Sequence, residues 1–160
     1  MEQPESIDII TTEAERNLGM LLDWIGRYDN RASLLFTVDL AMVGTLALIL
    51  SSSTYLVYDT LFLIAFVLLG ISILGTAITI FPHLSGPQDS LLYFGSIAKM
   101  EKTNFKNSFI ARTKNGYLDD LLAQCHINAK ILDLKFKVFR ISLAITIMAI
   151  IFWSLSLYLN

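Results

Sequence analysis

The fold is decided by a stretch without a charged side chain, LFLIAFVLLGISILGTAITIF at residues 61–81. Its 21 residues match the ~20 that an α-helix needs to cross the ~30 Å hydrocarbon core of a bilayer. Residues 141–159 form another uncharged run, of 19 residues. A further apolar run covers residues 34–50 and is interrupted only by Asp39. The sequence therefore predicts three membrane-spanning helices.

The composition of the whole chain agrees with a membrane protein. Charged residues make up 16% and hydrophobic residues 54% of its 160 residues, whereas a typical globular protein is ~25% charged. The mean hydropathy is +0.59, and a soluble domain of this size cannot bury so much apolar surface. One cysteine and a net charge of −2 disfavour a disulfide scaffold and a basic nucleic-acid-binding protein. The acidic N-terminal residues do not fit a signal peptide.

The basic residues indicate how the chain is oriented. Three of the twelve lie in residues 1–33 and nine in residues 82–140, with none in residues 51–60 or 141–160. Cytoplasmic segments of membrane proteins carry the excess of Lys and Arg. We therefore expect residues 1–33 and 82–140 in the cytoplasm, residues 51–60 as an extracytoplasmic turn, and the C-terminus outside.

The cytoplasmic segments are predicted to be helical. Apolar residues at spacings of three and four follow Thr12, a possible N-cap, and no proline separates them from the first span, so an amphipathic helix should continue into the membrane. A proline after the second span ends it, and one or two short helices surround Gly95. The turn-forming pair Asn115-Gly116 is expected to interrupt helical structure.

From Tyr117 the helical pattern resumes and runs into the third span, which gives a single helix ~64 Å long at 1.5 Å per residue. The predicted fold class is an all-α membrane protein. It has three transmembrane helices and a small helical cytoplasmic region, and its first and third spans extend into the cytosol.

The charges of the two cytoplasmic segments are opposite. Residues 1–33 hold seven acids and three bases, a net charge of −4, and residues 82–140 hold five acids and nine bases, a net charge of +4. Three interpretations remain open. The acidic segment packs against the basic one, the basic segment contacts an anionic leaflet, or the basic segment binds an anionic ligand.

No arrangement of residues indicates catalysis. His83 and His126 have no carboxylate or cysteine partner at metal-ligand spacing, and Cys125 falls on an apolar stripe typical of a reduced core thiol. Glycine-rich phosphate loops and the common hydrolase and zinc motifs are absent from the sequence. We expect no catalytic residue, no metal, no cofactor and no enzymatic activity.

Asp39 is the most informative single residue. It lies about 10 Å into the first span at 1.5 Å per residue, where a carboxylate costs roughly 2.5–3.5 kcal/mol on insertion scales. Such a residue usually faces the interior of a bundle or water. It either bonds a neighbouring helix at Ser72, Thr76 or Thr79, or it lines an aqueous path, which makes it a candidate gating residue.

A polar edge marks the cytoplasmic part of the last helix. Gln124, Asn128, Ile131 and Lys135 recur there at positions i, i+4, i+7 and i+11. Since buried polar groups are hydrogen-bonded, this pattern favours a helix-packing network.

Several short motifs resemble those of one family, the Pycsar transmembrane effectors. Residues 18–36, LGMLLDWIGRYDNRASLLF, are similar to the helix before that family's first span, where a Trp-Ile pair precedes an Asp-x-Lys-Ala element. Tyr93–Ile97, YFGSI, resembles Phe-Phe-Gly-Asp-Ile without its acid, and Pro82-His83-Leu84 replaces Pro-Arg-x. Residues 122–131, LAQCHINAKI, with Lys135, resemble the family's Leu-Ala-x-Gln-Ile…Ser-Lys-Ile…Lys helix.

The resemblance implies an anti-phage effector in the bacterial inner membrane. Such an effector senses a cyclic pyrimidine mononucleotide made by an adjacent nucleotide cyclase and disrupts the membrane, so that the infected cell dies (abortive infection). Three spans are too few to enclose an aqueous path, so a homo-oligomer is expected. Two alternatives remain open: a CBASS-type effector gated by a cyclic oligonucleotide, or a non-gated membrane scaffold.

The family pattern also marks candidate ligand residues on both helices that enter the membrane. The basic candidates are Arg31, Lys130 and Lys135, and Gln124 and Asn128 would read polar edges of the messenger. The alternative is that the basic residues only pair with Asp29, Asp133 or lipid phosphates, with the ligand near residues 99–106 or in a cleft between protomers.

Overall fold

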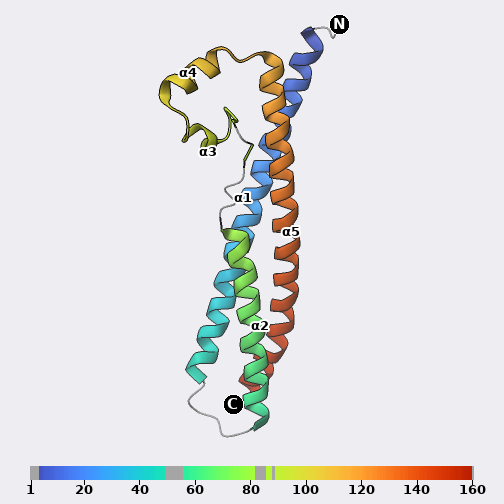
Figure 1. Ribbon diagram of the computed structural model, residues 1–160. Helices are drawn as coiled ribbons and strands as arrows, with labels where there is room; N and C mark the ends of the chain where they lie inside the picture. The colour runs from blue at the N-terminus through green and yellow to red at the C-terminus, as the bar shows by residue number, and fades with distance from the viewer. Residues whose placement is uncertain (1–3, 50–55, 82–85, 88, 160) are drawn as a thin grey trace. The chain divides into compact units, whose positions relative to one another are not determined.

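The computed structural model describes residues 4–49, 56–81, 86–87 and 89–159. Their regular secondary structure consists of helices, in the order α1 (Pro4–Ile49), α2 (Leu56–Ile80), α3 (Phe94–Ile97), α4 (Lys102–Ile110) and α5 (Lys114–Tyr158) (Figure 1). Three of them, α1, α2 and α5, contain a segment long and apolar enough to cross a membrane. The predicted all-α membrane fold is confirmed.

The chain divides into two compact units. We call Met1–Gly26 with His83–Asp133 the polar unit, and Arg27–Pro82 with Leu134–Asn160 the spanning unit. Two helices contribute to both units, because α1 is unbroken over 46 residues and α5 over 45. This confirms that the helices before the first and third spans continue into them.

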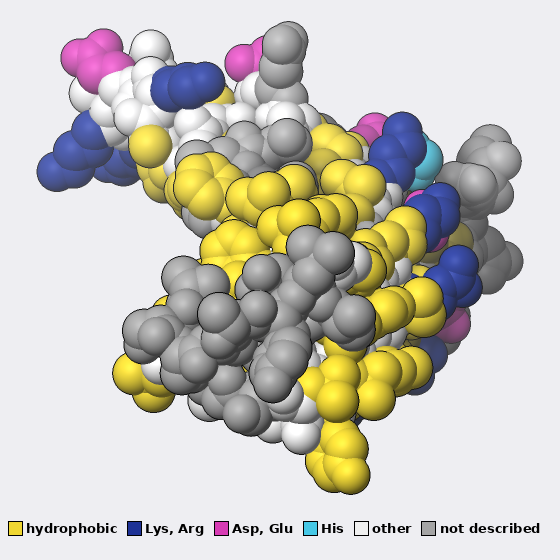
Figure 2. All heavy atoms as spheres, turned by 90° about the horizontal axis from the view of Figure 1, so that it is seen from below, with side chains coloured by type: hydrophobic (Ala, Val, Ile, Leu, Met, Phe, Trp, Pro, Cys, Tyr) yellow, Lys and Arg dark blue, Asp and Glu magenta, His cyan; other side chains and the backbone are white. Residues whose placement is uncertain are grey.

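The spanning unit is a packing of α1, α2 and α5 around small and branched side chains. Its core consists of Met42, Leu46, Ala65, Leu69 and Ala149, each at most 7% exposed. Large apolar side chains also point outward, among them Leu48 at 82% and Leu74 at 67% exposure, and hydrophobic side chains cover much of the described surface on the face that Figure 2 shows. Such a surface suits contact with lipid.

The polar unit is built on the first half of α5 and the start of α1. Ala14 and Leu121 are its buried apolar residues, 3% and 2% exposed. At the surface, the Lys114 ammonium donates to the Asp8 carboxylate at 2.8 Å. The acidic N-terminal segment therefore does contact the basic one, as the first interpretation of the charges predicted.

One predicted boundary was wrong at the start of α1. The helix begins at Pro4 and not near Thr12. Proline suits the first helical turn, where its missing N–H is not needed and its φ is already helical. Thr12 is not an N-cap, because its hydroxyl donates to the Asp8 carbonyl one turn back at 2.9 Å.

Another boundary was wrong before α5. Asn115-Gly116 does not interrupt the helix, because α5 begins at Lys114 and includes both residues. Thr113 acts as the N-cap: its side-chain oxygen accepts from the Gly116 N–H at 3.1 Å. That cap satisfies a donor that has no partner within the helix, so a glycine is tolerated in this first turn.

The second spanning helix is longer than the apolar run that predicted it. It begins at Leu56, before the expected Leu61. The run was cut at an acid, but an acid near a helix N-terminus is favourable. Two helix termini were predicted, at residues 51–54 and at residues 82–85. Both lie outside the described residues.

Candidate functional site

The spanning unit buries a set of polar side chains between its helices. All are at most 3% exposed, and they come from α1 (Asp39), α2 (Ser72, Thr76, Thr79) and α5 (Lys135, Ser142, Thr146). Within a membrane each such group must find its partner inside the protein. We call these residues the polar seam.

Asp39 lies in the seam with 0% exposure. Its Oδ1 accepts from the Thr146 hydroxyl at 2.9 Å. The Thr146 and Ser72 hydroxyl oxygens are 2.7 Å apart, and Ser72 also donates to the Ser142 carbonyl at 3.2 Å. A chain of hydrogen bonds thus joins α1, α5 and α2.

The expected bond from Asp39 to Ser72, Thr76 or Thr79 was wrong in its partner. The Thr76 hydroxyl donates to the Ser72 carbonyl at 2.9 Å, and the Thr79 hydroxyl donates to the Thr76 carbonyl at 2.7 Å. These protons satisfy carbonyls of α2 itself, so they are not available to a carboxylate on α1.

The second carboxyl oxygen of Asp39 is an exception within the seam. Among the described residues, Oδ2 is buried and has no hydrogen-bond partner. An unsatisfied buried acceptor costs about 1–3 kcal/mol, and ionisable residues inside membranes are typical of functional positions. This oxygen is the feature that most favours a role for Asp39 beyond packing.

Lys135 forms a clamp among the three helices of the spanning unit. Its side chain is 4% exposed and its ammonium donates to the Asp29 carboxylate on α1 at 2.5 Å. The same nitrogen donates to the Thr79 carbonyl at 2.5 Å. That carbonyl is in the last turn of α2, where backbone oxygens lack partners within the helix. Lys135 therefore closes the end of α2 and ties it to α1.

Arg31 is exposed and lies on α1 in the same unit. Its guanidinium is 5.9 Å from the centroid of the Tyr28 ring. Tyr28 is itself held edge-on against Phe136 and Phe139, at centroid distances of 5.4 Å and 5.9 Å. Arg31 is thus the accessible cation of the two ligand candidates in the spanning unit.

Three ligand candidates belong to the polar unit. Asn128 donates to the Gln124 backbone carbonyl at 2.9 Å, and Gln124 donates from Nε2 to the Ser90 hydroxyl at 3.1 Å. The structure brings these two amides together as the helix-packing network that the spacing favoured. Lys130 is exposed on α5.

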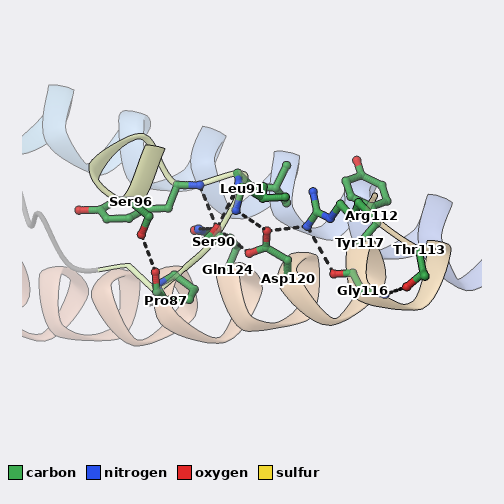
Figure 3. A network of polar contacts seen from close by, with 12 residues as sticks. Pro87, Ser90, Leu91, Ser96, Arg112, Thr113, Gly116, Tyr117, Asp120 and Gln124 are labelled. Carbon is green, nitrogen blue, oxygen red and sulfur yellow. Dashed lines mark hydrogen bonds and ion pairs between the residues drawn. The ribbon is translucent and has the colours of Figure 1, made fainter. Parts of the chain in front are cut away.

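Sequence reasoning missed the centre of this network (Figure 3). The Asp120 carboxylate accepts from the Ser90 hydroxyl at 2.5 Å, the Leu91 N–H at 3.0 Å and Arg112 at 2.5 Å. Ser90 in turn accepts from the Leu92 and Tyr93 N–H groups at 3.1 Å and 3.0 Å. These bonds fix the segment before α3 onto α5, and no local motif predicted them.

Tyr117 connects the same region to α1. Its hydroxyl donates to Glu15 at 2.6 Å, and the Arg112 guanidinium lies 4.7 Å from its ring centroid. The pKa of Tyr117 is raised, first by the hydrogen bond to Glu15 and to a smaller extent by partial burial. Tyr117 lies in the part of α5 outside the membrane-spanning segment.

A groove of about 490 Å³ runs between α1 and α5 in the polar unit. Cys125 lines it and donates from Sγ to the Ala14 carbonyl at 3.6 Å. Burial raises the pKa of this thiol, which lies before the spanning part of α5. His126 also lines the groove, while His83 lies outside the described residues. No group of three or more His, Cys, Asp or Glu side chains in the described part of the chain could hold a metal ion.

The fold and the buried polar seam define a class, the helical membrane proteins that carry a polar unit on extended spanning helices. Within it, the chain belongs to the Pycsar effector family, because the profile of the Pycsar effector protein domain matches residues 13–160. This confirms the resemblance found in the sequence. The family is one of anti-phage defence effectors and is not a family of enzymes.

One curated relative is the Pycsar effector protein GmPycTM of Gulbenkiania mobilis. The two chains are 40% identical over 53 residues, which cover 33% of this chain and 27% of that protein. The alignment thus spans about a quarter of the relative's length. No solved structure matches the chain.

Proposed function

We propose that the protein senses a cyclic nucleotide, in particular a cyclic pyrimidine mononucleotide supplied by a nucleotide cyclase, and disrupts the inner membrane as a homo-oligomer. Death of the infected cell then precedes release of the phage. The observation that carries this proposal is the continuity of α1 and α5, each of which contributes to both units without a break. These two helices are the proposed route by which ligand binding in the polar unit shifts the spanning unit between two arrangements. The action is not enzymatic.

The proposal includes an oligomer because one protomer supplies three spanning helices. In the described part of the spanning unit, the core and the polar seam lie between α1, α2 and α5, so we expect an aqueous path to form between protomers. Asp39, whose Oδ2 has no partner among the described residues, is the proposed gating residue. Rotation of α1 against α5 would break its bond to Thr146 and free the carboxylate for water.

The ligand residues are proposed in two sets, one in each unit. Gln124, Asn128 and Lys130 form the set in the polar unit, and Arg31 and Lys135 the set in the spanning unit. Charge-assisted contacts to phosphate are about twice as strong as neutral hydrogen bonds, so the three cations are expected to dominate. Since Asp29 holds Lys135, a phosphate at that position would have to displace a carboxylate.

The proposed location is the bacterial inner membrane, with the N-terminus and residues 82–140 in the cytoplasm and the C-terminus outside. Its support is the placement of all twelve basic residues in segments 1–33 and 82–140. In that orientation the polar unit faces the compartment in which a cyclase would release its messenger.

The experiment is dye leakage from liposomes that contain the purified full chain. Cyclic UMP, cyclic CMP, cyclic AMP, cyclic GMP and a cyclic oligonucleotide are titrated separately. Leakage with a cyclic pyrimidine mononucleotide supports the proposal, and leakage with the oligonucleotide alone assigns the chain to the CBASS type. Indifference to every nucleotide, together with no toxicity on co-expression with a cyclase, would leave the non-gated scaffold.

A further inference from the structure

The groove of the polar unit combines a large apolar surface with a few polar groups. Its volume of about 490 Å³ is within the ~300–1,000 Å³ of small-molecule sites. One wall comes from α1 and the other from α5, and the lining residues are Asn17, Met20, Leu21, Trp24, Cys125, His126, Ala129 and Leu132. None of these carries a carboxylate.

Trp24 stands out in this groove because its side chain is 53% exposed. Membrane proteins often place tryptophan at the lipid interface, but position along α1 argues against that role here. Trp24 precedes Leu34, the first residue of the predicted span, by ten residues, which is about 15 Å of helix. The headgroup layer extends only ~5–8 Å beyond the hydrocarbon core. Contact with lipid therefore does not account for the exposed indole, and a different molecule is expected to cover it.

We propose that this groove binds the base of the cyclic nucleotide, an inference that rests on the proposed function. The base stacks on the Trp24 indole, and the Asn17 amide, which offers both a donor and an acceptor, reads its edge. His126 lies at the groove, and Lys130 follows it by one helical turn on the same side of α5. These two side chains bind the cyclic phosphate.

Lys130 differs from two other cations of the polar unit, which already have carboxylate partners. Arg112 is paired with Asp120, and Lys114 is paired with Asp8. Gln124 and Asn128 bond to Ser90 and to each other, so they would have to exchange these partners to contact the messenger. Lys130 is exposed beside a groove lined without carboxylates, which favours an anion there over the polar network.

The groove carries its own reporters. Cys125 is the only cysteine of the chain and lines the groove, so a bound nucleotide should slow its alkylation by a maleimide. Trp24 is one of two tryptophans, and Trp153→Phe leaves it as the only one. The experiment measures Cys125 alkylation and Trp24 fluorescence at fixed pH, on the full chain in liposomes, with cyclic UMP, CMP, AMP and GMP.

We expect the nucleotide that triggers leakage to protect Cys125 and to quench Trp24 over the same concentration range. Trp24→Ala should weaken that nucleotide by about 5- to 150-fold, the range for loss of one base–aromatic stack. Trp24→Phe should restore much of the affinity, which separates stacking from misfolding. Lys130→Gln should weaken it about tenfold or more. Lys114→Gln, which changes an exposed lysine of the polar unit away from the groove lining, is the matched control.

Three outcomes would overturn the inference. A nucleotide that triggers leakage but leaves Cys125 and Trp24 unchanged binds elsewhere, and the proposed function then still stands. Protection of Cys125 that depends on protein concentration and not on nucleotide means that a second copy covers the groove. If no nucleotide causes leakage, protection or quenching, the groove site and the proposed function fail together.

Discussion

Lys135 and Asp39 are buried ionisable residues of the spanning unit, and they differ in how their charges are matched. The Lys135 ammonium has a carboxylate and a backbone carbonyl as partners. Asp39 has one hydroxyl donor for one of its two oxygens. A matched charge stabilises one arrangement of helices, whereas an unmatched one favours a second arrangement. We therefore expect substitution of Lys135 to change stability and substitution of Asp39 to change gating.

Lys135→Met should destabilise the protein by about 1.5–3 kcal/mol, the range for a hydrogen bond to a charged group. The substitution keeps the apolar stem but leaves Asp29 and the end of α2 without their donor. Thermal unfolding in detergent micelles measures the change, and Lys130→Met, at an exposed site, is the control. Equal stability of both variants would show that the clamp contributes nothing.

Asp39→Leu should preserve membrane insertion but abolish permeabilisation or lock it in one state. The leucine removes the acceptor of the Thr146 hydroxyl and the unpartnered oxygen together. Asp39→Asn keeps the bond to Thr146 without the charge, so its effect should be milder. Dye leakage and membrane fractionation are measured for both variants. If Asp39→Leu leaks and gates like the parent, Asp39 is only a packing residue.

At the scale of the elements, the contact between α2 and α5 depends on a missing side chain. A Cβ at Gly75 would overlap the Ser142 hydroxyl, while at Gly70 it would meet nothing within 4 Å. The close approach allows Ser72 on α2 to reach the Ser142 carbonyl on α5. Small residues at such contacts are typical of helix pairs in membranes.

Gly75→Ala should therefore cost about 1 kcal/mol, the low end of overpacking, because the Ser142 hydroxyl has to turn away from the new methyl group. Ser142→Ala removes the hydroxyl that the new methyl group meets, so the double variant should regain most of the loss. Gly70→Ala is the matched control. The measurement is thermal unfolding of the parent and the four variants, and a double variant no more stable than Gly75→Ala would place the strain elsewhere.

The predictability of these elements follows the range of the forces involved. The three spans and the continuity of α1 and α5 were visible because hydrophobic runs and apolar periodicity are local. Two N-terminal helix boundaries were missed. A first-turn proline outweighs the signal at Thr12, so α1 begins at Pro4, and the Thr113 cap outweighs the signal at Gly116, so α5 begins at Lys114. The Asp39–Thr146 and Asp120–Arg112 pairs depend on tertiary packing. The sequence pattern offered other partners for Asp39 and none for Asp120.

At the scale of the whole molecule, the long helices α1 and α5 each contain both a part of the proposed ligand site and a membrane-spanning segment. Both α1 and α5 contribute residues to the groove and, further along, to the polar seam. Spatial continuity alone is not evidence of coupling. The coupling is instead expected to require a difference in affinity between two arrangements of these helices. Asp39, whose Oδ2 has no hydrogen-bond partner among the described residues, is the residue whose hydrogen bonds we expect to differ between the two arrangements.

The orientation of the molecule in the membrane decides whether a cytosolic messenger can reach the groove at all. Because all twelve basic residues lie in segments 1–33 and 82–140, the positive-inside rule predicts Gly116 in the cytoplasm and Asn160 outside. Two reporters, one active only in the cytosol and one active only outside it, are fused at each position. A fusion at Asn160 that is active only in the cytosol would contradict the three-span topology, because an odd number of spans must separate the termini.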